Sequence, residues 1–142
     1  MAEKVLLVDD EEAFLSIMSE RMKNRGMTVL TTASATEAIS IVEAESFDVI
    51  VLDLQMPGMD GLEAIKTLKS KQPELQIILL TGHVTLERGI EAMKLGAADL
   101  MEKPADINIL EYKIRKAHAT NRILAQKRTE EKIKEIIENK GW

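Results

Sequence analysis

Five short apolar runs, each followed by a longer amphipathic stretch, constrain the fold of this chain more than any other feature. The apolar runs occupy residues 4–8, 27–32, 47–53, 75–81 and 98–102. Their length and their content of Val, Ile, Leu and Thr are typical of β-strands. The amphipathic stretches predict helices at about residues 12–25, from Ser34 or Thr36 to 45, 61–70, 85–95 and from about 106 onward. Strands that alternate with helices favour a five-stranded parallel sheet with helices on both faces, that is, a doubly wound α/β fold.

The composition limits the class of protein. Of the 142 residues, 45% are apolar but only 3% are aromatic, so we expect an aliphatic core. The chain has no cysteine, which excludes disulfides, thiolate metal sites and a cysteine nucleophile. No signal peptide is visible, and no run approaches the roughly 18 apolar residues of a membrane span. We therefore expect a cytoplasmic protein with no membrane partner.

Charge is distributed unevenly along the chain. Residues 1–118 carry 13 Lys and Arg against 20 Asp and Glu, whereas residues 119–142 carry 6 against 4. An acidic body disfavours nucleic acid as its partner, because binding to the phosphate backbone needs a positive surface. About 24 tail residues are too few for a DNA-binding module with a core of its own. We expect no direct nucleic-acid binding by this chain.

The tail at residues 119–142 favours a helix, since it contains no Pro and a single Gly near its end. An apolar seam runs into it from the predicted fifth helix and ends at Leu124, because Arg128 and Glu131 take the next positions. A second apolar group, beginning at Ile133, is out of phase, so a long uniform coiled coil is not expected. Three alternatives stay open: an arm that continues the fifth helix, a separate helix that folds back, or a linker to an output domain.

Polar residues gather where the predicted strands end. Asp9 and Asp10 follow the first strand, and Asp53 ends the third. Thr81 ends the fourth strand, and Lys103 follows the fifth. Taken singly, an acid can cap a helix, a threonine can sit in a turn and a lysine can be a surface cation. Asp53 has the weakest ordinary explanation, because a mostly apolar run precedes it and no helix begins directly after it.

Together these residues indicate a site for a phosphoryl group, because the carboxyl ends of parallel strands share one edge of the sheet. Three carboxylates that converge repel each other, and a hard divalent cation relieves that repulsion. Mg²⁺ prefers one or two carboxylates together with waters and a phosphate oxygen. Lys103 can neutralise a phosphoryl oxygen and Thr81 can donate to another. A carboxylate is ordinarily ionised at neutral pH, so Asp53 would need no separate base as a nucleophile.

Four segments resemble, in order and spacing, those of bacterial response-regulator receiver domains: VLLVDDEE, VIVLDLQMPGMDG, LLTGH and GAADLMEKP. The resemblance covers about residues 3–118. It implies a flavodoxin-like fold, similar to that of chemotaxis regulators, with strand order 2-1-3-4-5. It also implies a cis peptide bond between Lys103 and Pro104. On this basis residues 1–118 are expected to form the receiver domain, and residues 119–142 a helical C-terminal extension or linker.

The resemblance implies roles for the acidic residues. Asp53 would accept the phosphoryl group from the phosphohistidine of a sensor histidine kinase or from a phosphotransfer protein. Asp10 would bind Mg²⁺ directly, and Asp9 would assist through water. Asp53 itself and the backbone carbonyl of Gln55 would complete the protein ligands.

The resemblance also implies how the signal would leave the site. Thr81 would be the switch hydroxyl that moves toward the phosphoryl group, and Lys103 the cation that holds it. The predicted fourth helix, fifth strand and fifth helix would form the moving surface. This surface would contact an output domain, a partner protein or a second copy of the chain. The C-terminal helix would be an alternative surface for contact with a second copy. Leu100 stands where most receivers carry Tyr or Phe, which puts the usual aromatic route in doubt. Gln55 and His83 would line the pocket entrance and tune how fast water reaches the acyl phosphate.

Three other functions compete with this one. A Mg²⁺ phosphatase with an aspartyl-phosphate intermediate needs an acid two residues after the nucleophile, where this chain has Gln55. A flavodoxin-like cofactor-binding protein needs a Ser/Thr/Gly-rich loop after the first strand, where residues 9–12 are all acidic. An atypical receiver that acts mainly as an interaction or dimerisation module stays open because of Leu100. We predict a phosphoacceptor switch that catalyses only its own phosphorylation and dephosphorylation, and not a metabolic enzyme.

Overall fold

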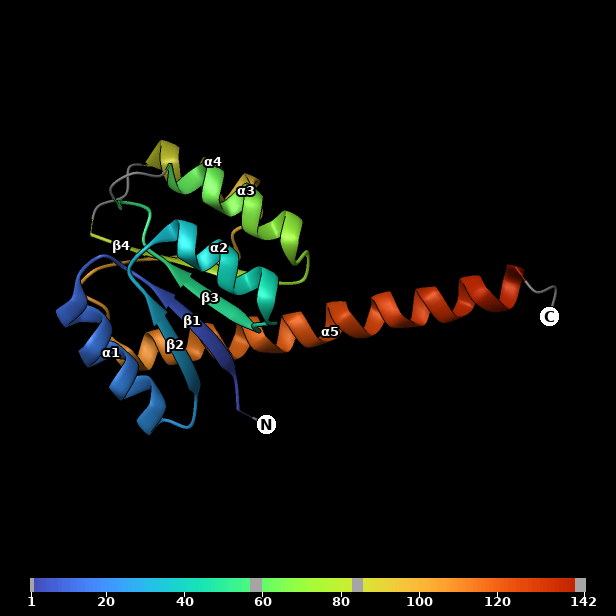
Figure 1. The fold of residues 1–142 in the computed structure, drawn as a ribbon, viewed down its shortest axis with the longest axis horizontal. Helices are drawn as coiled ribbons and strands as arrows, with labels where there is room; N and C mark the ends of the chain where they lie inside the picture. The colour runs from blue at the N-terminus through green and yellow to red at the C-terminus, as the bar shows by residue number, and fades with distance from the viewer. Residues whose placement is uncertain (1, 57–59, 83–85, 140–142) are drawn as a thin grey trace.

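The computed structural model describes residues 2–56, 60–82 and 86–139. Five parallel strands form one central sheet in the order β2-β1-β3-β4-β5 (Figure 1). The strands are β1 (Lys4–Val8), β2 (Thr28–Thr32), β3 (Val49–Leu52), β4 (Gln76–Thr81) and β5 (Asp99–Glu102). The helices are α1 (Glu12–Asn24), α2 (Ala35–Ala44), α3 (Gly61–Lys71), α4 (Leu86–Lys94) and α5 (Ile107–Asn139). The predicted doubly wound α/β fold and its strand order are confirmed.

Helices cover both faces of the sheet, with α2, α3 and α4 on one face and α1 and α5 on the other (Figure 1). Successive strand residues point to opposite faces. In β1, Leu6 and Val8 pack toward α2 and α3, whereas Val5 and Leu7 pack toward α1 and α5. Apart from Phe47, the buried apolar side chains among the described residues are aliphatic or methionine, as the composition predicts.

Capping and turn residues set several element boundaries. Ser34 caps α2, since its hydroxyl accepts a hydrogen bond from the Glu37 N–H at 3.2 Å. β3 is shorter than the predicted 47–53, although the N–H groups of Asp48 and Asp53, just outside it, still donate to the Lys4 and Val8 carbonyls at 2.9 and 3.1 Å. The predicted start of the fourth helix, at Thr85, lies outside the described residues.

α5 is one continuous helix of 33 residues and runs through the predicted domain boundary at residue 118. Its first part packs on the sheet through Leu110, Ile114 and Ala117, and its last part projects away from the body (Figure 1). No Gly or Pro breaks the helix at the boundary, so the alternative of a separate helix that folds back is wrong for residues 119–139. Within the ranges that the structure describes, no helix, α5 included, has the length and apolar character needed to cross a membrane.

Candidate functional site

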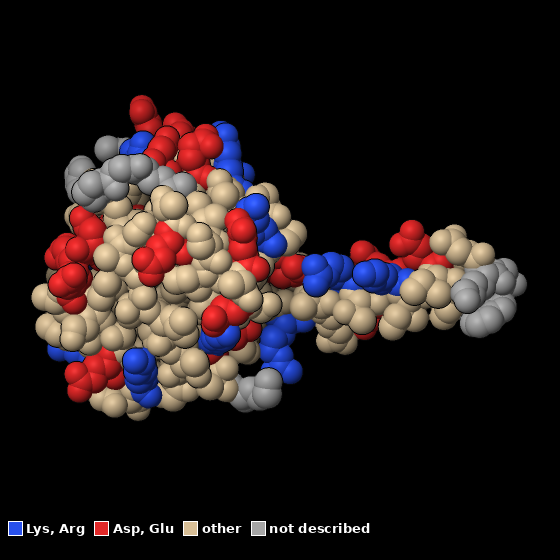
Figure 2. Space-filling view, viewed as in Figure 1, with Lys and Arg blue, Asp and Glu red and all other residues tan. Residues whose placement is uncertain are grey.

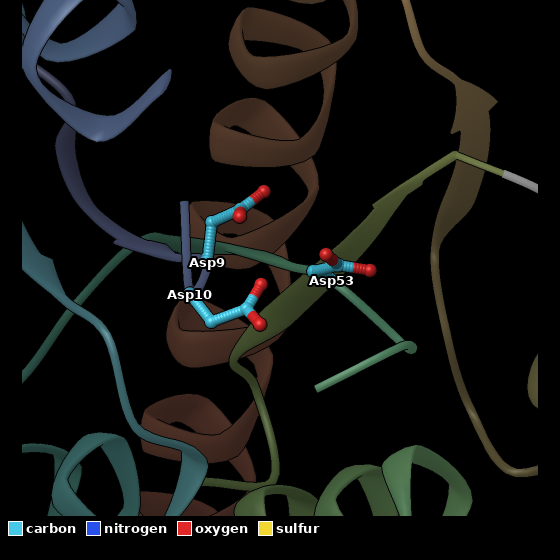
Figure 3. Close-up of side chains that lie close together, drawn as sticks. All are labelled: Asp9, Asp10 and Asp53. Atoms are coloured by element: carbon cyan, nitrogen blue, oxygen red, sulfur yellow. The ribbon is translucent and has the colours of Figure 1, made fainter. Parts of the chain in front are cut away.

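The three predicted acidic residues meet at the carboxyl ends of β1 and β3. These strands are paired as far as Val8 and Leu52, so the residues that follow, Asp9 and Asp53, are neighbours. Asp10 comes next in the chain, and each of the three residues offers a carboxylate oxygen within 4.8 Å of the other two. Figure 3 shows Asp9 and Asp10 on the chain that leaves β1, beside Asp53. Strand register therefore brings together carboxylates that are more than 40 residues apart in sequence.

Two of these carboxylates are buried and are oriented by backbone groups. The exposed fraction is 1% for Asp9 and 5% for Asp53. Asp9 Oδ1 accepts a hydrogen bond from the Glu11 N–H at 2.9 Å, and Asp53 Oδ1 accepts one from the Gln55 N–H at 2.9 Å. Asp10 is exposed and reaches the cluster from the solvent side. The backbone thus fixes one oxygen of each buried carboxylate and leaves the other for a cation.

Lys103 supplies a cation to both buried carboxylates. Its Nζ lies 2.6 Å from Asp9 Oδ2 and 3.7 Å from Asp53 Oδ2, so it hydrogen-bonds to the first and only forms an ion pair with the second. Burial of the ammonium acts to lower the pKa of Lys103. The hydrogen bonds to Asp9 and Glu11, together with the charges of Asp9 and Asp53, outweigh burial and raise this pKa above its usual value.

Thr81 ends β4 with a buried hydroxyl. Its side chain is fully buried, and its Oγ1 has no hydrogen-bond partner among the residues that the structure describes. A buried hydroxyl without a partner is costly, so such a group calls for an explanation. The Lys103 N–H donates to the Thr81 carbonyl at 2.8 Å, and the Lys103–Pro104 peptide bond is cis. This backbone contact ties the end of β4 to the chain that carries the ammonium.

The donor set fits a hard divalent cation. The cluster offers carboxylate oxygens from three residues, and one of them, Asp10, is open to solvent. Mg²⁺ is bound by few carboxylates and keeps several waters, which such a half-open site permits. Because the Gln55 N–H donates to Asp53, the backbone of Gln55 stays beside the cluster, and its carbonyl is a candidate further ligand.

Residues 5–115 match the family described as response regulator receiver domain. The chain belongs to this family. The match spans all five strands and most of the helices that pack on them, and it confirms the resemblance drawn from the four motifs. In family terms the protein is a receiver domain of two-component response regulators.

The chain is similar to curated response regulators and to solved receiver structures. It is 33% identical over 128 residues to the C4-dicarboxylate transport transcriptional regulatory protein DctD of Rhizobium meliloti, and the match covers 90% of this chain but 28% of DctD. It superposes on the beryllofluoride-activated NtrC4 receiver domain dimer with a TM-score of 0.79 at 33% identity, covering 83% of this chain and 98% of that one. A Burkholderia pseudomallei response regulator with a phosphorylated aspartic acid, a calcium ion and citrate gives a TM-score of 0.76 at 27% identity, covering 90% and 74%. The chain spans about a quarter of the length of the first curated relatives it matches.

Two of the three residues predicted to tune the receiver, Gln55 and Leu100, belong to the described part of the chain. The Gln55 side chain is exposed, and its Oε1 lies 3.9 Å from where a Cβ on Gly82 would be, so it reaches the chain that follows β4. Leu100, in β5, is half-buried and lines an open apolar groove of about 810 Å³ between β5 and α4, together with Ile90. His83 lies outside the described residues, and the tuning roles stay predictions.

Sequence reasoning missed two partners of Lys103. Glu11 Oε1 lies 3.1 Å from the Lys103 Nζ, and the Phe14 ring centroid lies 4.4 Å from it. Glu11 directly follows Asp9 and Asp10, so its position in the sequence was a signal for a place near the site. The neighbouring sequence does not show, however, in which direction its side chain points. Only the packing of α1 against the chain after β5 brings these groups together.

Proposed function

We propose that this receiver is a cytoplasmic, Mg²⁺-dependent phosphoacceptor switch in which Asp53 takes a phosphoryl group from a histidine kinase or a phosphotransfer protein. One observation carries the proposal: three carboxylates, the Lys103 ammonium and the Thr81 hydroxyl, to which no described residue hydrogen-bonds, lie at one edge of the sheet. Such a set suits an anion that arrives together with a divalent cation. The buried position of Asp53 at a strand end suits a reaction that depends on positioning and charge neutralisation.

In the proposed reaction an Asp53 oxygen attacks the phosphorus atom of the donor. A new O–P bond forms as the P–N bond of the phosphohistidine breaks, and the bonding electron pair goes to the donor imidazole. Asp53 Oδ1 is held by the Gln55 N–H, which leaves Oδ2, the oxygen nearer Lys103, as the attacking atom. Hydrolysis would later pass the phosphoryl group to water and restore the carboxylate.

Asp9, Asp10, Asp53 and the Gln55 carbonyl would hold the Mg²⁺. When bound, Mg²⁺ supplies positive charge that offsets the carboxylates and the oxygens of the transferred group. Lys103 would pair with a phosphoryl oxygen, since its ammonium already lies 3.7 Å from Asp53 Oδ2. The Thr81 hydroxyl, which has no hydrogen-bond partner within the described part of the chain, would donate to another phosphoryl oxygen.

Movement of Thr81 would carry the signal to the surface formed by α4, β5 and α5. In this chain Leu100 occupies the aromatic position of the family, and the groove beside it is lined by apolar side chains of α4. We propose that Leu100 and α4 repack as aliphatic groups in place of a ring rotation. Two solved neighbours support the chemistry, since one is a response regulator with a phosphorylated aspartic acid and the other is a beryllofluoride-activated receiver domain dimer.

The experiment that tests this function is intact-mass measurement after incubation with acetyl phosphate. With Mg²⁺ we expect one added phosphoryl group, and with EDTA or in Asp53→Asn we expect none. Asp60→Asn is the matched control, because Asp60 caps α3 from an exposed position and Asn caps equally well. An adduct on Asp53→Asn, or no adduct and no beryllofluoride binding by the wild type, would contradict the proposal.

We also propose that the receiver forms a homodimer through the α4–β5–α5 face or through the projecting part of α5. On α4 the exposed fraction is 80% for Leu86, 47% for Ile90 and 44% for Met93. The projecting helix exposes Ile133 and Ile137, beside its charged side chains (Figure 2). Both sets are large apolar groups that water covers in the monomer.

Sedimentation velocity with and without beryllofluoride separates the two dimer surfaces. Ile90→Glu is expected to abolish association if the α4–β5–α5 face is the contact. Ile133→Glu is expected to abolish it if the helix is the contact. Wild-type protein that stays monomeric at high concentration in both states would rule out both surfaces.

A further inference from the structure

The Lys103 ammonium is held by more groups than the proposed chemistry requires. Its distances are 2.6 Å to Asp9 Oδ2, 3.1 Å to Glu11 Oε1 and 3.7 Å to Asp53 Oδ2. The Phe14 ring is a further neighbour, with its centroid 4.4 Å from Nζ. The ammonium is therefore closer to Asp9 and Glu11 than to Asp53, the residue that it would serve during phosphoryl transfer.

Glu11 is well placed to act on the ammonium from outside the carboxylate cluster. Its N–H donates to Asp9 Oδ1 at 2.9 Å and its carbonyl accepts from the Leu15 N–H at 3.0 Å, so its backbone is fixed at the start of α1. Its side chain is 66% exposed, yet its carboxylate turns to Lys103. Substitution at such an exposed position should leave the fold intact.

Glu11 also differs from the other acids in what a metal ion would do to it. Asp9, Asp10 and Asp53 form the group whose oxygens could share one cation, and Glu11 lies outside that group. When a divalent cation takes part of the charge of Asp9 and Asp53, Glu11 keeps its full charge for Lys103. Its hold on the ammonium therefore persists in the metal-loaded state, which is the state that reacts.

We propose that Glu11 is a positioning residue that tethers the Lys103 ammonium on the Asp9 side of the site and thereby slows phosphorylation of Asp53. The inference rests on the proposed function. The ammonium lies 2.6 Å from Asp9 Oδ2 and 3.1 Å from Glu11 Oε1, and a phosphoryl oxygen on Asp53 would compete with both for its three N–H donors. We expect this competition to draw the ammonium away from Glu11, so that the weakened contact with Glu11 opposes formation of the phosphorylated state.

Three measurements on three variants test the tether: beryllofluoride binding, Mg²⁺ affinity and the rate of phosphorylation by acetyl phosphate. Glu11→Gln removes the charge, and Glu11→Asp keeps the charge but draws the carboxylate back by one methylene. Glu12→Gln is the matched control, because it removes an exposed acid one residue further along the chain. Beryllofluoride binding is titrated by NMR in saturating Mg²⁺, and Mg²⁺ affinity is measured separately without beryllofluoride.

Both Glu11 variants are expected to lower the beryllofluoride midpoint and to speed phosphorylation by acetyl phosphate about 3- to 10-fold, the range for a typical net hydrogen bond, because the exposed Glu11 carboxylate is partly screened by water. Glu12→Gln is expected to stay within about twofold of the wild type, since an exposed charge without a fixed partner contributes little. Mg²⁺ affinity of Glu11→Asp is expected to stay close to that of the wild type, because the charge near the cluster is kept.

Each of the following results contradicts the proposed tether, for a different reason. If Glu11→Asp matches the wild type while Glu11→Gln binds tighter, only the charge matters and no tether exists. If both variants bind beryllofluoride more weakly, Glu11 supports the active position of Lys103. If neither differs from Glu12→Gln, the contact is without effect. A wild type that takes up neither phosphoryl group nor beryllofluoride would overturn the proposed function as well, so the two failures are distinguishable.

Discussion

The carboxyl edge of the sheet and the projecting part of α5 are opposites in how they hold charged side chains. At the edge, Asp9 and Asp53 are almost fully buried, and backbone N–H groups and one ammonium orient them. Along the projecting helix, most side chains are exposed. Arg128, for example, is 66% exposed where it pairs with Glu74 at 2.8 Å. The same types of residue therefore meet a low-dielectric setting in one region and water in the other.

This difference decides how large the effect of a substitution should be. A buried carboxylate that loses its cation keeps a desolvated charge, which is strongly unfavourable. An exposed ion pair contributes little, because water and salt screen it. Substitutions at the sheet edge are therefore expected to have large effects, and changes along the helix small ones.

The largest effect is expected from Lys103→Met. Removal of the ammonium takes away the only cation within reach of Asp53 among the described residues. We expect the phosphorylation rate with acetyl phosphate to fall about 100-fold, as when one donor to a developing anion is lost. Lys113→Met is the matched control, since Lys113 pairs with Asp99 away from the edge, at 2.8 Å. Similar phosphorylation rates for the two variants would contradict the expectation that charges at the sheet edge matter more than charges elsewhere on the surface.

A second large effect is expected from Gly61→Ala, which tests the packing behind the site. A Cβ at position 61 would lie 2.5 Å from Leu54 Cδ2 and 2.9 Å from the Leu54 carbonyl oxygen. We expect a loss of about 1–3 kcal/mol in the free energy of unfolding, typical of overpacking, measured by urea denaturation. Gly82→Ala is the control, since the nearest atom among the described residues, Gln55 Oε1, would lie 3.9 Å from its Cβ, an ordinary contact. Equal free energies of unfolding for the two variants would show that Leu54 moves away from the added methyl group without loss of stability.

Shortening the tail is expected to have a small effect. Removal of residues 130–142 keeps the contacts of Asn121 and Arg128 with Glu74. We expect the melting temperature to change by less than about 2 °C and the phosphorylation rate by less than twofold, because few contacts cross to the body. A shorter form that ends at His118 should lose about 1 kcal/mol more, since the Asn121 hydrogen bond to the Glu74 carbonyl goes as well. Failure of the longer form to fold would contradict a receiver boundary near residue 118.

The smallest effect is expected from alkaline pH. The pKa of Lys103 is raised above its usual 10.5 in the folded state, so its contribution to stability is complete below that pH and is lost as the pH rises through the raised pKa. The difference in unfolding free energy between wild type and Lys103→Met should stay constant from neutral pH to about pH 10 and shrink above it. Urea denaturation at each pH measures this difference. A difference that grows with pH would mean that the ammonium is not stabilised by its acidic neighbours.

Much of this receiver could be predicted from sequence because its signals are local. Alternation of apolar runs and amphipathic stretches specified the strands, the helices and the parallel sheet. The rule that strand ends share one edge then grouped Asp53 with the acids after β1. For the tail, the sequence leaves three alternatives open, because a helix-favouring sequence does not say whether contacts with other parts of the chain will bend or end the helix. Likewise, the contact between Gly61 and Leu54 depends on how α3 approaches the end of β3.

The sequence by itself determined the order of elements and the identity of the charged residues at the strand ends, because periodicity and turn chemistry act over a few residues. Only the tertiary structure decided which of those residues touch. Glu11 and Lys103 are 92 positions apart, and their contact depends on how α1 and the chain after β5 pack beside the sheet. Side-chain contacts across such separations are set by the register of β1, β3 and β4 and by helix packing, which no short stretch of sequence encodes.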